Sequence, residues 1–483
     1  MPDDLLTAPR WKPEQLGLPM PDDRDAVSAC LPLWSHNIGY EEADPAVLER
    51  LQAAYPRFCI HPDVQELCGT LFADSAGLPF ISAAAAERAV QYVQHAGGSS
   101  ATLRPIDGQP CVAVSVCEDE LPLLKQYWQH AGELVSSRVA RHILNQQPVT
   151  FSETESRSTV RSRFADLHQV SANNVFLFSA GMGAIAGTWR AINALAPNRP
   201  TCQFGFPYVD TLKIQERFPG ATSSFLPFGT ASDAAELTEL FPIHRYSAVF
   251  CETPTNPLLL TPDLLALRRL TAEQGAILVV DDTLRACSRH SVLPKCDVVV
   301  TSLTKYFNGY GNVLAGAMVV NPDSQHAPKL LSTIDDQFEE TLSDLDVAVL
   351  EQNSRDLQSR VRRCVSNARV IVTRLRQHPA VADVFYPEWD DEDDPSCGAL
   401  LSVVLRDAAR VTPRVFDRLQ VSKGPNLGTN FTLCCPYTIL AHYTELDFAE
   451  HCGASRWLLR LSVGMEPVEE LWDRLTDALD SVA

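Results

Sequence analysis

The sequence predicts an α/β fold built around a mostly parallel sheet. Short apolar runs recur between about residues 131 and 330, small or polar turn residues follow them, and helical patterns lie between them. Buried strands that alternate with helices are typical of a parallel sheet covered by helices on its faces. The runs expected as strands are residues 175–178, 201–204, 248–251, 276–280, 298–301 and 315–320, and the helix after the first of them is expected over residues 184–195.

Two further regions flank this core. The first 35 residues hold several prolines and little periodicity, which predicts a surface arm. Asp44 can cap a helix that has Pro45 at its first position, and residues 112–116 form a strand pattern. After residue 341, a helical pattern (342–377), a strand (400–405) and an amphipathic helix (467–482) predict a smaller C-terminal α/β domain, with the acidic cluster 388–394 as a solvated loop. We therefore expect an N-terminal extension over 1–130, a large domain over 131–330 and a small domain over 331–483.

Charge and cysteine usage narrow the class of protein. The 483 residues carry 40 Lys and Arg against 60 Asp and Glu, so the net charge is −20. This disfavours non-specific binding to nucleic acid or to an anionic membrane, and an anionic ligand must be held by a local site. The 14 cysteines form no zinc-binding or C-x-x-C pattern. With an acidic N-terminus and no apolar run near 18 residues, we expect a cytoplasmic protein with reduced thiols and no bound metal.

Four groups of polar or small residues follow predicted strands. In such sheets, ligands bind at the carboxyl ends of the strands. Each group alone has an ordinary structural interpretation as well: a tight turn at 179–183, a helix cap at Asp281, a surface position for Lys305 and a Pro-rich turn at 252–257. The functional interpretations are an anion cradle, a carboxylate for a cationic ring nitrogen, a metal or a ribose, and a lysine able to form a Schiff base.

Taken together, these groups describe a site for pyridoxal phosphate (PLP). An anion cradle, then an asparagine, then an aspartate, then a lysine 24 residues later is the arrangement that such a site needs. The residues also resemble the cystathionine γ-synthase family, a Cys/Met-metabolism group of PLP enzymes. That family shows Ser-Gly-Met-x-Ala-Ile, Glu-Thr-Pro-x-Asn-Pro, Val-Asp-Asn-Thr and Ser-x-Thr-Lys-Tyr in this order, and Arg-Leu-Ser-Val-Gly-Ile-Glu near the C-terminus. The matching segments here are 180–185, 252–257, 280–283, 302–306 and, near the C-terminus, 460–466.

The resemblance implies a fold of type I, with a seven-stranded sheet in the large domain. Residues 37–42 and 55–58 (Tyr-Pro-Arg-Phe) are similar to the extension of fungal members. The resemblance also implies roles for individual residues. Lys305 binds PLP covalently and is catalytic, and Tyr208 stacks on the ring and is catalytic. Asp281 pairs with the ring nitrogen, and Asn256 forms a hydrogen bond with the phenolic oxygen of the ring. The phosphate is held by Gly181, Met182, Ser302 and Thr304, and the substrate carboxylate is held by Arg460.

Three departures from the family pattern concern the site. Where the family has Tyr-x-Arg, which reaches the phosphate of a neighbouring subunit, this chain has Ser136-Ser137-Arg138. Arg138 is therefore expected to bind cofactor across a homodimer or homotetramer. Asn426 replaces the serine of a Ser-Leu-Gly motif near the substrate and is expected to bind substrate, so either the amino-acid pocket or the path of the second substrate is expected to differ. Asp282 replaces an asparagine and adds negative charge.

The resemblance implies γ-substitution on an O-acyl-L-homoserine, with O-acetyl-L-homoserine as the expected ester. Cysteine attacks Cγ in a cystathionine γ-synthase, whereas a carbon or amine nucleophile does so in relatives of fungal specialised metabolism. The alternatives are a cystathionine γ-lyase, a β-lyase, and a non-catalytic scaffold that keeps the fold. Loss of Lys305 or Asp281 would favour the scaffold, and both residues are present.

Overall fold

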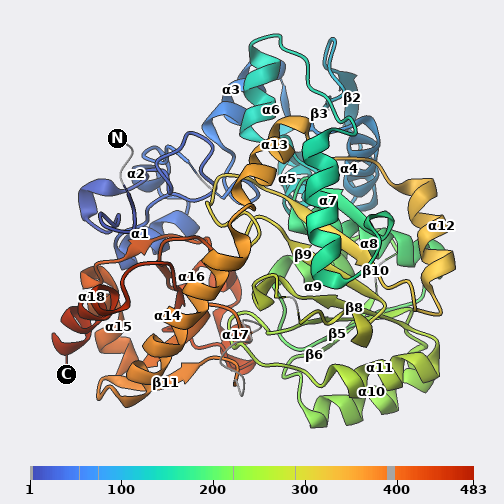
Figure 1. The fold of residues 1–483 in the computed structure, drawn as a ribbon. Coiled ribbons are helices and arrows are strands. Elements are labelled where there is room, and N and C mark those ends of the chain that lie inside the picture. The colour runs from blue at the N-terminus through green and yellow to red at the C-terminus, as the bar shows by residue number, and fades with distance from the viewer. Residues whose placement is uncertain are drawn as a thin grey trace.

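The large sheet has seven strands in the order β4-β10-β9-β8-β7-β5-β6. The computed structural model describes residues 4–53, 55–73, 75–220, 222–288, 290–388 and 397–482, and Figure 1 shows its fold. Strand β10 runs antiparallel to β4 and β9, and the remaining pairs are parallel, which confirms the predicted fold class. The strands are β4 (Val175–Phe178), β5 (Thr201–Phe204), β6 (Ser223–Leu226), β7 (Ala248–Glu252), β8 (Ile277–Asp281), β9 (Val298–Ser302) and β10 (Gly316–Val320).

Side chains that alternate along these strands feed two separate cores. In β8, Leu278 and Val280 belong to one apolar cluster, and Ile277 and Val279 belong to the other. A strand buried on both faces needs apolar residues at every position, which explains the continuous runs in the sequence. The helices of this region are α7 (Glu155–His168), α8 (Gly181–Leu195), α9 (Val209–Arg217), α10 (Ala231–His244), α11 (Leu264–Gln274), α12 (Ala327–Gln337) and α13 (Asp344–Asn353).

The C-terminal part forms a five-stranded mixed sheet in the order β11-β12-β15-β14-β13. The predicted helical stretch 342–377 is two helices, because the chain turns at Ser354, the C-cap of α13. The acidic cluster 388–394 lies almost entirely outside the described residues. The elements are α14 (Leu357–Gln377), β11 (Val381–Phe385), β12 (Leu400–Leu405), α15 (Ala408–Arg418), β13 (Ser422–Lys423), β14 (Leu433–Cys435), α16 (Tyr437–His442), α17 (Leu446–His451), β15 (Leu459–Ser462) and α18 (Val468–Asp480).

The N-terminal segment does not form the predicted surface arm. Met20, Ala26 and Cys30 are fully buried, and the backbone N–H of Leu31 donates to the carbonyl of Lys423 at 2.9 Å. The blue N-terminal segment therefore lies against the red C-terminal domain in Figure 1. Its apolar residues are too few for a periodic pattern, but Met20 and Cys30 pack in one cluster with Phe431 and Leu433 of the C-terminal part.

The rest of the extension carries a small antiparallel sheet in the order β1-β3-β2 and several helices. Among the described residues, no helix combines the length and the apolarity that a membrane span requires. The elements are α1 (Trp34–Glu41), α2 (Pro45–Leu48), α3 (Pro62–Leu71), β1 (Ala76–Phe80), α4 (Ala83–His95), β2 (Thr102–Pro105), β3 (Val112–Val116), α5 (Leu121–Ala131) and α6 (Ser137–Leu144).

Candidate active site

The carboxyl ends of β7, β8 and β9 meet at one edge of the large sheet and border a cavity. Glu252 and Asp281 are neighbours in register at the ends of β7 and β8. The cavity opens to solvent, and the space inside it and its mouth together measures about 980 Å³. Its walls come from the N-terminal extension, the large sheet and the C-terminal domain. The sequence-predicted residues on its wall are Gly181, Met182, Tyr208, Asn256, Asp281, Ser302, Lys305 and Arg460.

Lys305 extends from the segment after β9 into this cavity. Its Nζ donates to Asn426 Oδ1 at 2.8 Å and to the Tyr55 hydroxyl at 3.1 Å. Burial lowers the pKa of the Lys305 ammonium, although the neighbouring Tyr55 opposes this effect. A lysine with a lowered pKa has a larger fraction of neutral amine near neutral pH, and the neutral amine is the form that acts as a nucleophile and accepts a proton.

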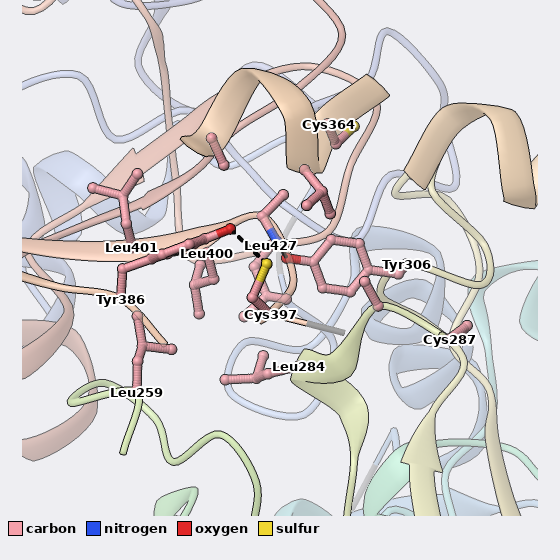
Figure 2. Close-up of a cluster of buried hydrophobic side chains, with 14 of the residues drawn as sticks. Leu259, Leu284, Cys287, Tyr306, Cys364, Tyr386, Cys397, Leu400, Leu401 and Leu427 are labelled. Carbon is pink, nitrogen blue, oxygen red and sulfur yellow. Dashed lines mark hydrogen bonds between the residues drawn. The ribbon is translucent and has the colours of Figure 1, made fainter. Parts of the chain in front are cut away.

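The next residue, Tyr306, anchors the backbone of Lys305 against the C-terminal part of the chain. Its ring lies among Leu284, Leu400 and Leu427 in the cluster of Figure 2, and its hydroxyl accepts a hydrogen bond from the Ala399 N–H at 3.0 Å. Because Tyr306 is buried against the C-terminal domain, the backbone that carries Lys305 cannot turn away from the cavity without disrupting this core.

Asp281 is a carboxylate with no cationic partner among the described residues. Its Oδ1 accepts from the Thr283 N–H at 2.9 Å. Burial, together with the charge of Asp282, raises the pKa of Asp281 to about 6, although the contacts with Thr283 oppose the shift. The neighbouring Asp282 is turned toward Thr301, whose hydroxyl donates to it at 2.5 Å, and is absent from the cavity wall. Asp281 therefore presents an unpaired carboxylate that a protonated ring nitrogen would satisfy.

The N-terminus of α8 forms an anion cradle beside Ser302. The N-cap residue Ala180 makes no side-chain hydrogen bond to the first turn, so the N–H groups there are free to bind a ligand. A Cβ placed on Gly181 would lie 2.7 Å from the Cβ of Ser302. Only glycine permits this close approach of the helix end to the hydroxyl.

Arg460 and Asn256 form a polar pair that also lines the cavity. Arg460 stacks on the Tyr437 ring at 4.4 Å and donates to the Pro425 carbonyl at 2.8 Å and to Asn256 Oδ1 at 3.3 Å. Within the described part of the chain, no carboxylate forms an ion pair with this buried guanidinium. An arginine left without a carboxylate is suited to bind one from a substrate.

Three sequence-predicted residues do not lie on the cavity wall. The Thr304 hydroxyl exchanges two hydrogen bonds with the backbone of Ala315. Arg138 contacts Asn312, Asp25 and Asp346 of its own chain. Asn426 is buried behind Lys305 and holds its amine, while its Nδ2 has no hydrogen-bond partner in the described structure. Phosphate binding by Thr304 and Arg138 and substrate binding by Asn426 stay predictions.

Two residues that sequence reasoning had not assigned to the site lie at its centre. Tyr55 contacts Lys305, and Arg57 donates to the Tyr208 hydroxyl and to Asp210 Oδ2, the latter at 2.5 Å. Burial would raise the pKa of Asp210, but the Arg57 charge and the His130 hydrogen bond lower it. The Tyr-Pro-Arg-Phe motif was visible in the sequence, but it follows no strand, so nothing placed it at the sheet edge.

The family comparison agrees with this geometry. The model of the Cys/Met metabolism PLP-dependent enzymes matches residues 149–480, and the chain belongs to that family. It is 32% identical to a cystathionine γ-synthase of Neurospora crassa, over 97% of this chain and 98% of the relative. It is 31% identical to the cystathionine γ-synthase-like protein ankD of Aspergillus thermomutatus, over 97% and 95% respectively.

A solved structure confirms the fold. The cystathionine γ-synthase from Xanthomonas oryzae pv. oryzae in complex with cystathionine superposes with a TM-score of 0.59 at 23% identity, and the match covers 68% of this chain and 86% of that one. The protein is thus a PLP-dependent enzyme of fold type I, similar to cystathionine γ-synthases over most of its length.

The residues present fit this cofactor. The free N–H groups of α8 and Ser302 suit a phosphate, the unpaired Asp281 suits the ring nitrogen, and Lys305 borders the same cavity. Tyr208 lies on the cavity wall, with its N–H donating to Glu252 Oε2 at 2.8 Å. Glu252 is buried, and burial and the nearby Asp281 raise its pKa. A neutral Glu252 leaves the ring-binding region with fewer negative charges.

Proposed function

We propose that this enzyme catalyses γ-replacement on an O-acyl-L-homoserine, with O-acetyl-L-homoserine as the ester. The observation that carries the proposal is that Lys305, Asp281 and Arg460 line the same cavity. Asp281 is the anchor for the cofactor, and Arg460 is the anchor for an amino-acid carboxylate. An amine that lines the same cavity as both anchors can move protons at the carbon atoms next to that carboxylate.

PLP, when bound, supplies an electron sink that stabilises negative charge on an attached amino acid. Arg460 holds the carboxylate of the ester, and Asn256 orients the guanidinium. Lys305 moves a proton away from Cα and then one away from Cβ, and it returns one proton to each carbon after the new bond to Cγ has formed, so that both C–H bonds are restored. The acyloxy group leaves Cγ with its bonding electron pair as a carboxylate, and the lone pair of the second substrate forms the new bond to Cγ. The proton of that nucleophile passes to solvent.

The second substrate enters a largely apolar part of the cavity. Its wall includes the side chains of Tyr40, Phe58, Leu427, Leu440 and Tyr437. This wall accommodates the carbon skeleton of a thiol, an amine or a β-keto acid, and the proposal includes all three classes.

Incubation with O-acetyl-L-homoserine and single members of these classes tests the proposal. Mass spectrometry should find a product that joins the four-carbon amino-acid skeleton to the nucleophile, with one acetate released per product. Lys305→Ala is the control and should form none. Release of 2-oxobutyrate whatever nucleophile is present would show a γ-lyase instead, and pyruvate formed from cystathionine would show a β-lyase. An intact ester after incubation with the loaded enzyme would refute the proposal.

A further inference from the structure

Tyr55 is a residue of the N-terminal extension that touches the reacting lysine. It follows α2 in sequence and lies 250 positions before Lys305, yet its hydroxyl is 3.1 Å from Lys305 Nζ. The same Nζ lies 4.4 Å from the centre of the Tyr55 ring. Among the described residues, the other hydrogen-bond partner of Lys305 Nζ is Asn426 Oδ1. An amide oxygen neither donates nor takes up a proton at neutral pH, so Asn426 cannot exchange a proton with the amine.

The charges around Tyr55 favour its ionised form. Burial raises the pKa of the phenol, but the positive charges of Lys305 and Arg57 outweigh burial, so the pKa of Tyr55 is lowered. Arg57 lies 5.6 Å from the centre of the Tyr55 ring and is held there by Asp210 and by the Gln129 carbonyl. Burial lowers the pKa of Lys305 as well, so both members of this contact have pKa values below their usual ones.

Tyr208, the tyrosine implied by the family resemblance, is placed differently. Its hydroxyl accepts from Arg57, and burial raises its pKa well above the usual value for tyrosine. No hydrogen bond joins it to Lys305 in the described structure. The cavity wall carries four tyrosines, Tyr40, Tyr55, Tyr208 and Tyr437. Among the described residues, Tyr55 is the one that forms a hydrogen bond with the amine.

We propose that Tyr55 is a catalytic acid–base residue that exchanges a proton directly with the Lys305 amine and is supplied to the site by the same chain. The inference rests on the proposed function in one respect, that Lys305 is the reacting amine. In the first half of the cycle the neutral Lys305 amine takes a proton from Cα, and one N–H proton passes from the resulting ammonium to the ionised Tyr55 oxygen. In the second half the O–H proton returns to the amine, so protons balance and no further reactant is needed.

Exchange of the Cα proton in deuterated water tests this role without a leaving group or a nucleophile. The cofactor-loaded enzyme is given a simple L-amino acid, and NMR follows the loss of the Cα proton signal. Tyr55→Phe keeps the ring and removes the hydroxyl, so we expect exchange to fall by about 100-fold or more. Its pH profile should also lose the limb that Tyr55 titration produces. Tyr92→Phe, which removes a hydroxyl bonded to Gln126 outside the cavity, is the matched control and should leave exchange unchanged.

A titration of the cofactor-free chain gives an independent readout. The groups that face Tyr55 are Lys305, Arg57 and Tyr208, and Arg460 faces Lys305. Tyrosinate absorption should show one tyrosine that ionises below the usual range. Tyr55→Phe should remove this step, and Lys305→Met should move it to higher pH because a positive charge is lost.

Co-expression of Tyr55→Phe and Lys305→Ala chains tests the supply from the same chain. Neither site of a mixed dimer then has both residues, so no exchange activity should return. Recovery would show that Tyr55 serves the neighbouring subunit. Wild-type exchange with an unchanged pH profile in Tyr55→Phe would overturn the proposal, even if O-acetyl-L-homoserine were turned over. A slowed exchange would support it, even if the ester were not a substrate.

Discussion

At the scale of single residues, Asp281 shows how a site prepared for a cofactor lowers the stability of the empty chain. Its pKa of about 6 in the folded chain lies above the usual value of 3.8. The unfolded chain therefore releases this proton more readily, and the folded chain loses stability as the pH rises from about 4 to about 6.

We predict that Asp281→Asn stabilises the cofactor-free chain above this window. The shift corresponds to about 3 kcal/mol at most at about pH 7, and the difference should vanish below about pH 4. Urea unfolding of both chains at several pH values measures it. The same variant should bind PLP more weakly, because the ring nitrogen loses its anion. If the two chains were equally stable both at about pH 7 and below about pH 4, Asp281 would only cap the segment that follows it.

Asn426 provides a second prediction at this scale. A serine at this position is too short to reach Lys305, whose amine lies 2.8 Å from Asn426 Oδ1. Asn426→Ser should slow all products by a common factor of about 10, the equivalent of one hydrogen bond to a charged group. Competition between cysteine and acetoacetate gives the product ratio, which should stay constant. A changed product ratio would instead show that Asn426 helps to select the nucleophile.

Residues that follow a buried strand could be predicted from the sequence pattern, Arg460 came from the family resemblance, and Tyr55 was missed. Asp281 and Lys305 could be found because a buried strand fixes where its next residues emerge. Tyr55 could not, because only the packing of an irregular segment on the distant domains brings it to the sheet edge. Thr304 precedes the lysine as the motif requires, but the backbone of Ala315 satisfies its hydroxyl.

At the scale of elements, the prediction was most accurate where strands are buried on both faces. β12 was predicted over its full length, and β4, β5, β7, β8, β9 and β10 to within a residue at each end. The edge strand β6 was missed because its sequence Ser-Ser-Phe-Leu is partly exposed and gives no continuous apolar run. The seventh strand came from the family resemblance and is confirmed.

The loop that carries Gly428 allows a prediction about how two elements meet. Gly428 has a φ of +73°, and a Cβ there would lie 2.7 Å from the Tyr306 nitrogen and 2.9 Å from the Lys305 carbonyl carbon. Gly428→Ala should therefore lower the free energy of unfolding by more than about 2 kcal/mol and should reduce cofactor loading. Gly108→Ala is a matched control, because Gly108 has a φ of +70° with open space around it. A similar loss of stability in both variants would show that backbone strain alone acts at Gly428.

At the scale of the whole molecule, the cavity gathers positively charged side chains although the protein as a whole is strongly negative. A chain of net charge −20 brings Lys305, Arg57 and Arg460 to one cavity, while Glu252 on its wall has a raised pKa. This is the local site for an anion that the composition required. The three side chains come from the three regions predicted along the chain, so the site exists only when those regions pack together.

Arg138 provides the prediction about assembly. It lies outside the cavity of its own chain, and the family resemblance implies a role at a neighbouring subunit. We expect that co-expressed Lys305→Ala and Arg138→Ala chains regain part of the turnover, because one site of a mixed dimer is then intact. Each variant expressed alone is the control. An active monomer in sedimentation, or no recovery from a verified mixed dimer, would place Arg138 in a structural role.

The most direct test of the site is the identity of the lysine that holds PLP. Lys423 is an alternative to Lys305, because it is also buried and burial lowers its pKa to about 8. The Lys423 amine, however, donates to the carbonyls of Pro32 and Asp417, away from the cavity. Borohydride reduction of the loaded enzyme, followed by peptide mass spectrometry, should find the cofactor on Lys305 alone, with the visible absorption band lost on reduction. Cofactor attached to Lys423, or to no lysine, would contradict the account.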